Sequence, residues 1–351
     1  MSVSTVLCSI PCAATLWLCT LVPPATLLAQ VVAPGYQSLL QSMNSGANSL
    51  AVVDDEVVWF DGLTLFVDTP GQPSRALLTF PSFRFGSFTV SVGNGNVLFA
   101  ENSYGELWRV PLDPSGTPTL LTTVQFAYDA VAIGSRMAVV SAKTGGFTAA
   151  HNDLIAIDLM TGASSTIGMV PGASGPLALN HRGELLYATA PLNFPPPPAS
   201  VELIRWNASQ WSLALNGGLV LTRANASLVI GGLDSLGDLA LDGDDDVIGS
   251  DWANARLLEI NDHGTTPSLS TLIDYGTSAV SASTLAFAAT GPANPDFEFE
   301  PFARSGSGEL LVVETDFFST TQVRRIATAP AALDVNSAAN PVPPGPFTLL
   351  L

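Results

Sequence analysis

A short pattern recurs along this chain: an apolar strand, a turn of Asp, Asn and Gly, a second apolar strand ending in an acidic or polar residue, and a third strand. The clearest copy runs from Asp238 to Asn261, and a looser copy runs from Thr89 to Leu112. Their turns contain Asp242-Gly243-Asp244 and Gly93-Asn94-Gly95, residues that tolerate the positive φ of tight hairpins. One such unit cannot bury its own apolar face, so the repetition predicts a radial array of small sheets.

Copies of the second strand can be placed along the whole chain. They begin near Glu56, Asn96, Arg136, Glu184, Asp246 and Glu309. Each contains a short apolar run bounded by Gly, Asn or Asp, which is typical of a buried strand. The first copies are about 40 residues apart, a spacing that suits a four-stranded propeller blade. The sequence therefore predicts an all-β fold, a β-propeller of six four-stranded blades, over residues 47–330.

The other strands are marked less clearly. Fourth strands are expected at Thr119–Val124, Ser212–Leu215 and Ser270–Ile273, and the segment nearest to a helical period is Tyr36–Met43. Residues 30–46 are expected to close the ring by pairing with the last blade, because a propeller must join its ends to avoid a free sheet edge. Two insertions, 189–200 and 289–308, are either functional loops or decoration.

Charge and cysteine usage restrict the function. The formal net charge is −18, and Lys143 is the only lysine. A surface of this kind repels phosphate backbones and acidic lipids, which excludes nucleic-acid binding and polybasic membrane docking, and it attracts cations. Cys8, Cys12 and Cys19 are the only cysteines. The rest of the chain therefore has no disulfide framework and no cysteine nucleophile.

Both ends of the chain carry targeting features. Residues 1–29 are expected to be a secretory signal peptide, because they are apolar and because Pro11, Pro23 and Pro24 would interrupt a spanning helix. The competing interpretation is retention as an N-terminal anchor. The mature chain is expected to be exported, to the periplasm, the cell surface or the medium, without a membrane span. Residues 331–351 are expected to be a Pro-rich tail, either a disordered end or the remnant of a sorting signal.

The clearest copy resembles the NHL repeat. In that family an Asp-x-x-Asn-x-Arg pattern follows the second strand, and Asp251, Asn254 and Arg256 stand at those positions here. The resemblance implies that these residues tie the blade together and are not catalytic. It covers one blade in detail and the propeller in outline, so it concerns the fold more than the activity.

A candidate metal site follows from the propeller prediction. The ends of the second strands are expected to emerge on one face and to gather oxygen ligands around the channel mouth; these are Asp61, Glu101, Asn102, Asp251, Glu314 and Asp316. Carboxylate and amide oxygens are what Ca²⁺ prefers, and the alternative is hydrogen bonding within the blade turns. The arrangement is similar to that of the senescence-marker/gluconolactonase family of propellers, which implies a central divalent metal. First-strand residues that should carry its ligands, such as Ser49, Thr89 and Ala130, are not ligands.

Other candidates are weaker. Asp242, Asp244 and Asp246 match the first ligands of a calcium loop, but Val247 and Ala253 stand where the loop needs Gly and Glu. His151, His181 and His263 have no partner at metal-ligand spacing. Tyr104 and Trp252 are candidates for an aromatic binding face, or for packing between blades.

Two functions remain open at this stage. The first is a non-catalytic binding or scaffold protein that uses the channel-mouth face for a small molecule, a glycan or a protein. The second is a Ca²⁺-dependent hydrolase of the lactonase or esterase type, as the family resemblance implies. The sequence contains no recognisable nucleophile and base, so it leaves catalytic residues unassigned and does not decide whether the protein is an enzyme.

Overall fold

The structure, a computed structural model, describes most of the chain between residues 31 and 328. The described ranges are 31–32, 36–42, 49–53, 56–69, 71–146, 148–193, 196–241, 245–263, 266–276, 280–287, 310–316 and 321–328. For 31–32, 36–42 and the three ranges after 276, only the backbone is described. The predicted leader, the predicted tail and the whole of the 289–308 insertion lie outside these ranges.

The strands form six sheets. The first contains β3 (Ser49–Val53), β4 (Glu56–Phe60), β5 (Thr64–Asp68) and β6 (Arg75–Thr79). The second contains β7 (Gly86–Ser91), β8 (Asn96–Glu101), β9 (Glu106–Pro111) and β10 (Thr119–Thr123). The third contains β11 (Ala127–Ile133), β12 (Met137–Ala142), β13 (His151–Asp158) and β14 (Ser164–Pro171).

The remaining sheets follow in chain order. The fourth contains β15 (Leu177–Leu179), β16 (Leu185–Ala188), β17 (Val201–Trp206) and β18 (Ser227–Leu233). The fifth contains β19 (Leu239–Leu241), β20 (Val247–Asp251), β21 (Arg256–Asn261), β22 (Ser268–Asp274) and also β1 (Val31–Val32). The sixth contains β23 (Val280–Phe287), β24 (Leu310–Asp316), β25 (Thr321–Thr328) and β2 (Tyr36–Ser42).

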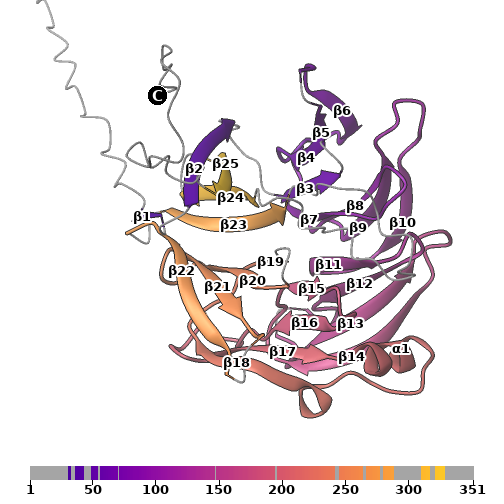
Figure 1. The fold of residues 1–351 in the computed structure, drawn as a ribbon. Helices are drawn as coiled ribbons and strands as arrows, with labels where there is room; N and C mark the ends of the chain where they lie inside the picture. Colours follow the sequence, from indigo (N-terminus) through magenta and orange to yellow (C-terminus); the bar gives the residue numbers. More distant parts are fainter. Residues whose placement is uncertain are drawn as a thin grey trace, which may run out of the picture.

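The sheets are arranged radially, which confirms the predicted β-propeller. The first strand of each sheet lies nearest the centre, and these inner strands are β3, β7, β11, β15, β19 and β23 (Figure 1). Each inner strand contacts the next one around the ring, and β23 contacts β3. Side chains are described for five of the sheets, β3 to β22, and the sixth is described by its backbone.

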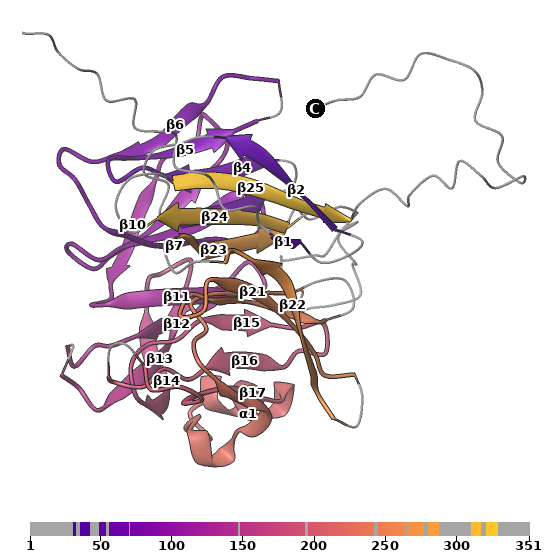
Figure 2. The same cartoon turned by 90° about the vertical axis from the view of Figure 1, so that its left-hand side faces the viewer.

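The N-terminal segment supplies outer strands to the last two sheets. β2 pairs antiparallel with β25, with Tyr36 opposite Thr328, and β1 pairs with β22, with Val31 opposite Asp274 (Figure 2). One sheet therefore has five strands, where the sequence predicted four. The segment nearest to a helical period in the sequence, Tyr36–Met43, contains the strand β2, in keeping with the predicted all-β fold.

The core lies between neighbouring sheets and not within any one of them. One cluster of buried residues joins the first two sheets through side chains such as Phe60 and Phe99, whose ring centroids are 4.7 Å apart. Similar clusters join the second sheet to the third, the third to the fourth and the fourth to the fifth. The second, third and fourth sheets thus bury both faces against their neighbours, which is why the unit must repeat.

One helix interrupts the all-β pattern. The sequence predicted a strand at Ser212–Leu215, but residues Ala208–Leu215 form helix α1, followed by a short 3₁₀ turn η1 (Arg223–Asn225). The fourth strand of that sheet is β18. Asn207 and Gln210 form a reciprocal capping box, and Trp211 and Ala214 are buried. The cap satisfies the first backbone N–H groups, and this favours a helix over a strand. Among the described residues, no helix is long and apolar enough to cross a membrane.

Candidate functional site

Three of the predicted metal ligands occupy the same place in different sheets. Asp61 follows β4, Glu101 ends β8 and Asp251 ends β20, so each begins the turn from a second strand to a third. The turns are equivalent, but no hydrogen bond or ion pair joins these three carboxylates within the described part of the chain. Each carboxylate is instead held by its own turn.

The carboxylates of Asp61 and Glu101 accept backbone N–H groups. Asp61 Oδ1 accepts from Leu63 N and Thr64 N, both at 2.7 Å. Glu101, which is fully buried, accepts from Ser103 N at 2.8 Å, from Tyr104 N at 3.1 Å and from Glu106 N at 3.0 Å. The dipoles of these N–H groups already stabilise the negative charge of each carboxylate. The carboxylates therefore hold their turns together and are not free to bind a metal ion.

Asp251 is the centre of a network within the fifth sheet. It accepts from Ser235 Oγ at 2.7 Å, from Asn254 Nδ2 at 2.9 Å and from Arg256 Nη2 at 2.6 Å. Asp251, Asn254 and Arg256 are the residues on which the NHL resemblance depends. The contact between Asp251 and Arg256 joins the end of the second strand to the start of the third. Asp251 therefore has the structural role that the resemblance implies.

The described residues do not form a calcium site. Among them, no group of three or more His, Cys, Asp or Glu residues is placed to hold a metal ion. The side chains of Glu314 and Asp316 lie outside the described residues, as do Asp242 and Asp244 of the acidic turn. In that turn Asp245 Oδ1 accepts the backbone N–H of His181 at 2.9 Å and lies 2.7 Å from His181 Nδ1, so the described part of it is a hydrogen-bonded contact between the fourth and fifth sheets.

A loop between the first two sheets brings aromatic side chains to the same face. Residues 80–85 connect β6 to β7 and hydrogen-bond to both flanking turns: Arg84 N donates to Gly62 O at 2.7 Å, and Asn102 N donates to Phe85 O at 2.7 Å. Gly62 has a φ of +98°, and a Cβ there would collide with the ring of Phe83. This loop is therefore fixed between the turns of Asp61 and Glu101.

The loop and the second turn together form an exposed cluster, which we call the aromatic patch: Phe83, Phe85 and Tyr104. Their exposed fractions are 56%, 64% and 59%. The rings of Phe83 and Phe85 meet edge to face with centroids 5.2 Å apart. Exposed aromatic rings at this density are uncommon on a protein surface that has no partner.

Arg84 lies beneath the aromatic patch with unmet hydrogen-bonding capacity. Its guanidinium carbon is 3.8 Å from the centroid of the Tyr104 ring, and its side chain is only 10% exposed. Its Nη1 is 3.8 Å from Glu101 Oε2, which is an ion pair but too long for a hydrogen bond. Nε and Nη1 of Arg84 and Oδ1 of Asn102 are buried without a hydrogen-bond partner. Buried polar atoms of this kind are rare in native proteins, and a ligand is one explanation for them.

The channel wall contains a second polar group. Asp129, on β11, accepts from Ala130 N at 2.7 Å and from Leu177 N, on the next inner strand, at 2.6 Å. Burial raises the pKa of Asp129 to about 7, although these two N–H donors oppose the shift. Tyr128 extends across the ring to donate its hydroxyl to Gly237 O at 2.7 Å. Burial of that hydroxyl, and then the charge of Asp238, raise the pKa of Tyr128.

The two predicted binding-face aromatics are in different surroundings. Tyr104 belongs to the aromatic patch, while Trp252 is half-buried beside Gly237, whose carbonyl oxygen accepts the hydroxyl of Tyr128. Sequence reasoning missed Phe83, Arg84 and Phe85, although Phe-Arg-Phe between Ser82 and Gly86 is a recognisable apolar and cationic run. It also missed Asp129, because nothing in the sequence distinguishes a buried strand Asp from an exposed one.

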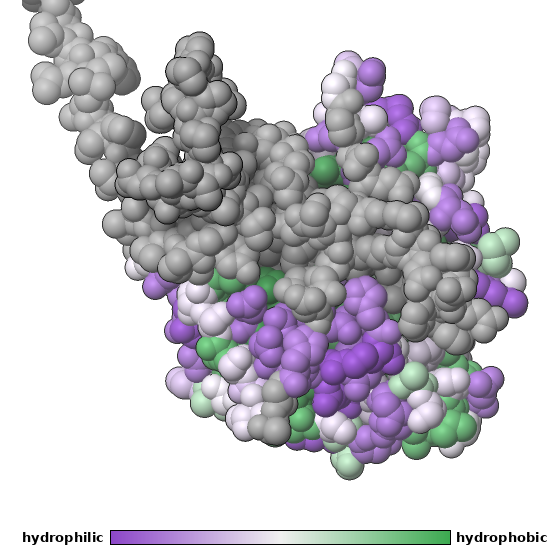
Figure 3. Space-filling view, in the orientation of Figure 1, coloured by the Kyte–Doolittle hydropathy of each residue, from purple (hydrophilic) through white to green (hydrophobic). Residues whose placement is uncertain are grey.

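Hydrophilic side chains cover much of the described surface on the face shown in Figure 3, with apolar residues interspersed. The acidic composition is consistent with this surface.

Comparison by sequence gives no relative. No protein-family model matches the chain, and no curated protein matches it.

Comparison by structure identifies the fold. The chain is similar to a gluconolactonase from Xanthomonas campestris, with a TM-score of 0.57 at 12% identity over 85% of this chain and 91% of that one. It is also similar to the PQQ domain of a pyranose dehydrogenase from Coprinopsis cinerea, with a TM-score of 0.58 at 9% identity over 85% and 97% of the two chains. A third similar structure is regucalcin, a calcium-binding protein from Agrobacterium tumefaciens, with a TM-score of 0.53 at 10% identity over 84% and 94%. At these identities the likeness concerns the fold alone, and the fold of this chain is that of the gluconolactonase-like β-propellers.

Proposed function

We propose that this protein is an exported, non-catalytic binding propeller that captures a protein partner through the aromatic patch and Arg84. The observation that carries the proposal is the guanidinium of Arg84, which is nine-tenths buried, has two nitrogens (Nε and Nη1) without a hydrogen-bond acceptor and lies against an exposed Tyr104 ring. Aromatic and Arg side chains at the centre of a surface are the residues that contribute most to binding between proteins.

The chemistry of the patch favours a polypeptide. Phe83 and Phe85 offer apolar surface, and the donors of Arg84 require an oxygen acceptor, which a backbone carbonyl or a side-chain carboxylate supplies. Glu101 balances the charge of Arg84 at 3.8 Å, so the patch does not select for strongly anionic ligands. A peptide segment with an apolar side chain beside a carbonyl oxygen would therefore match both the phenylalanine rings and the donors of Arg84.

The organisation of the chain is part of the same proposal. Residues 1–29 act as the signal peptide, 30–46 as the closing segment, 47–330 as the propeller and 331–351 as a tail. Each of the six sheets counts as one blade, which the succession of inner strands from β3 round to β23 supports. Export accounts for the apolar leader and for cysteines confined to it.

A random peptide library displayed on phage tests the binding function. Selection on the immobilised wild-type protein should enrich peptides that combine an aromatic or aliphatic side chain with an acceptor. Binding of these peptides should fall at least tenfold in Arg84→Met and in the double variant Phe85→Ala/Tyr104→Ala. Leu228→Ala is the matched control, because Leu228 is a comparably exposed apolar residue, at 52%, on β18. Failure to enrich any peptide, or equal binding by all variants, would show the proposal to be wrong.

A second candidate function is lactone hydrolysis. Asp129 favours it, because a carboxyl on the channel wall with a pKa of about 7 can exchange a proton near neutral pH. Structural similarity to a gluconolactonase adds fold-level support. The test is hydrolysis of a gluconolactone followed by proton release, with Asp129→Asn expected to lower the rate at least a hundredfold. A rate no faster than the spontaneous one would exclude this function.

Ca²⁺ is the metal ion that the sequence analysis associated with this second candidate function. Regucalcin is a calcium-binding protein of the same fold, but the described carboxylates that could serve here are engaged by N–H donors and guanidinium groups. We therefore expect a thermal melt to be unchanged by a chelator. A clear fall in Tm would contradict this and would point to Glu314 and Asp316, the two predicted ligands outside the described side chains.

A further inference from the structure

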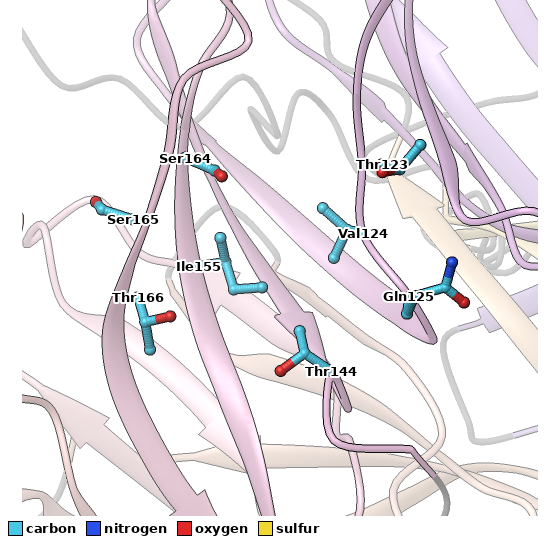
Figure 4. Close-up of a pocket in the computed structure, with 8 residues that line it drawn as sticks. All are labelled: Thr123, Val124, Gln125, Thr144, Ile155, Ser164, Ser165 and Thr166. Atoms are coloured by element: carbon cyan, nitrogen blue, oxygen red, sulfur yellow. The ribbon is translucent and has the colours of Figure 1, made fainter.

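A pocket lies between the second and third sheets, and one of its lining residues, Gln125, contacts the backbone of Tyr104 in the aromatic patch. Its volume is about 300 Å³, at the lower end of the range for small-molecule sites. Its lining residues are Thr123, Val124, Gln125, Thr144, Ile155, Ser164, Ser165 and Thr166 (Figure 4). None of them belongs to the aromatic patch or to the predicted metal ligands, and the binding function proposed above does not use this pocket.

The pocket is built where two outer strands meet. β10 ends at Thr123, and β14 begins at Ser164. Just before β14, Gly162 has a φ of +72°, and a Cβ there would collide with the carbonyl group of Leu121. The turn into β14 therefore lies directly against β10. The pocket lies beside this contact, and any residue with a Cβ at position 162 would be strained there.

The pocket has an apolar floor and a hydroxyl-bearing wall. Val124 and Ile155 are 4% and 7% exposed and belong to the core cluster between the two sheets. Figure 4 shows their side chains between Ser164, Ser165 and Thr166 on one side and Thr123 and Gln125 on the other. Ser164 and Thr166 alternate with buried Ile167 along β14, so both face the second sheet.

The polar groups of the wall are available to a ligand. Within the described part of the chain, the hydroxyls of Thr123, Ser164 and Thr166 have no protein hydrogen-bond partner. Thr144 donates its hydroxyl hydrogen to Asp153 Oδ2. The hydroxyl oxygen of Thr144 can therefore only accept a hydrogen bond from a ligand. Gln125 donates Nε2 to Tyr104 O at 3.3 Å, which leaves its amide oxygen as an acceptor.

No charged side chain lines the pocket. An ion bound there would lose hydration without gaining a counter-charge, and the overall charge of −18 also disfavours anions. A neutral ligand with many hydroxyl groups and an apolar face matches the lining: C–H groups against Val124 and Ile155, and hydroxyls against Ser164, Thr166 and Thr144. We propose that this pocket binds a neutral saccharide or polyol of about one ring.

Saturation-transfer NMR with the full chain tests the proposal. The probes are glucose, galactose, mannose and inositol, with glucuronate and glucosamine as charged counterparts. Neutral probes should bind, and the charged ones should bind at least tenfold more weakly. In Ser164→Ala/Thr166→Val, the Kd for the neutral probes should rise about tenfold or more, because two hydrogen bonds are lost. In Thr166→Trp, where the indole fills the pocket, binding should disappear.

Two controls locate the binding. Thr271→Val removes an exposed threonine from β22 of the fifth sheet and should change nothing. Phe85→Ala/Tyr104→Ala removes the aromatic patch and should also leave sugar binding intact, so this proposal and the proposed protein-binding function fail separately. No binding by any neutral probe, tighter binding of a charged one, or binding that survives Thr166→Trp would overturn the assignment.

Discussion

Two neighbouring residues, Glu101 and Arg84, illustrate how differently buried charges are treated in this protein. Glu101 accepts three backbone N–H groups and has no exposed surface. Arg84 is nearly as buried but leaves two of its nitrogens without a hydrogen-bond partner. The hydrogen bonds to Glu101 stabilise its turn. The unpartnered nitrogens of Arg84 lower the stability of the fold, and a bound hydrogen-bond acceptor would restore it.

The two residues should therefore respond differently to substitution. Glu101→Ala removes the acceptor of three N–H groups in a buried turn and should lower the free energy of unfolding by about 3 kcal/mol or more. Arg84→Met removes unmatched donors and should change it by less than about 1.5 kcal/mol. Denaturant titration measures both. Equal losses would mean that Arg84 is held by the fold as firmly as Glu101 is.

Asp129 predicts a pH dependence of stability. Its pKa in the folded state, about 7, lies above the ordinary value of 3.8. Below pH 4 the carboxyl is neutral in both states and the fold carries no penalty; as the pH rises to 7 the unfolded chain ionises first and stability falls. The wild-type Tm should therefore decline between pH 4 and 7 more steeply than that of Asp129→Asn. Asp113→Asn is the control, since local hydrogen bonds to Ser115 lower the pKa of Asp113 and remove it from this window. Parallel profiles for wild type and Asp129→Asn would contradict the expected linkage.

At the scale of elements, helix α1 shows local chemistry prevailing over the blade pattern. The repeat suggested a fourth strand where α1 lies, but Asn207 and Gln210 cap one another's backbone groups and start a helix. Trp211 is 2% exposed and donates its indole N–H to Gly183 O at 2.7 Å, so the helix is anchored to the turn between β15 and β16. The chain returns through η1 to form β18 as the outer strand.

Substitutions at Asn207 and Trp211 should distinguish the contribution of the N-cap to stability from that of the buried indole. Asn207→Ala should cost about 1 kcal/mol of unfolding free energy, because one capping interaction is lost. Trp211→Ala should cost about 3–5 kcal/mol, because it leaves a large cavity and an unmatched carbonyl. Guanidinium titration followed by circular dichroism checks both values. If Asn207→Ala proved the more costly of the two, the anchoring role of Trp211 would be wrong.

At the scale of the whole molecule, the ring is closed by strands from opposite ends of the chain. β2 completes the sheet of β25, and β1 adds to β22, so the first described residues pair with the last two sheets. Closure of this kind protects outer strands that would otherwise expose unpaired backbone groups.

Removal of the closing strands should destabilise the whole ring. A chain that begins at residue 46 lacks β1 and β2, while a chain that begins at residue 30 retains both. The shorter chain should unfold at a Tm lower by at least about 10 °C and with reduced cooperativity, because each sheet is stabilised by its neighbours. Scanning calorimetry of the two chains makes the comparison. A shared Tm would show that the pairing contributes little to stability.

The sequence by itself determined the architecture, because strand periodicity, turn residues and a repeat near 40 residues are local signals that only a radial array satisfies. It also placed Asp61, Glu101 and Asp251 correctly at equivalent turns. What Glu101 binds is decided within its own turn, as the bond from Ser103 shows, whereas the bond from Ser235 to Asp251 joins residues 16 positions apart and forms only in the folded sheet. The unmet donors of Arg84 and the pocket between β10 and β14 likewise depend on contacts between blades. A repeat encodes how each blade folds, whereas the surface left between two blades depends on how residues distant in the chain fit together.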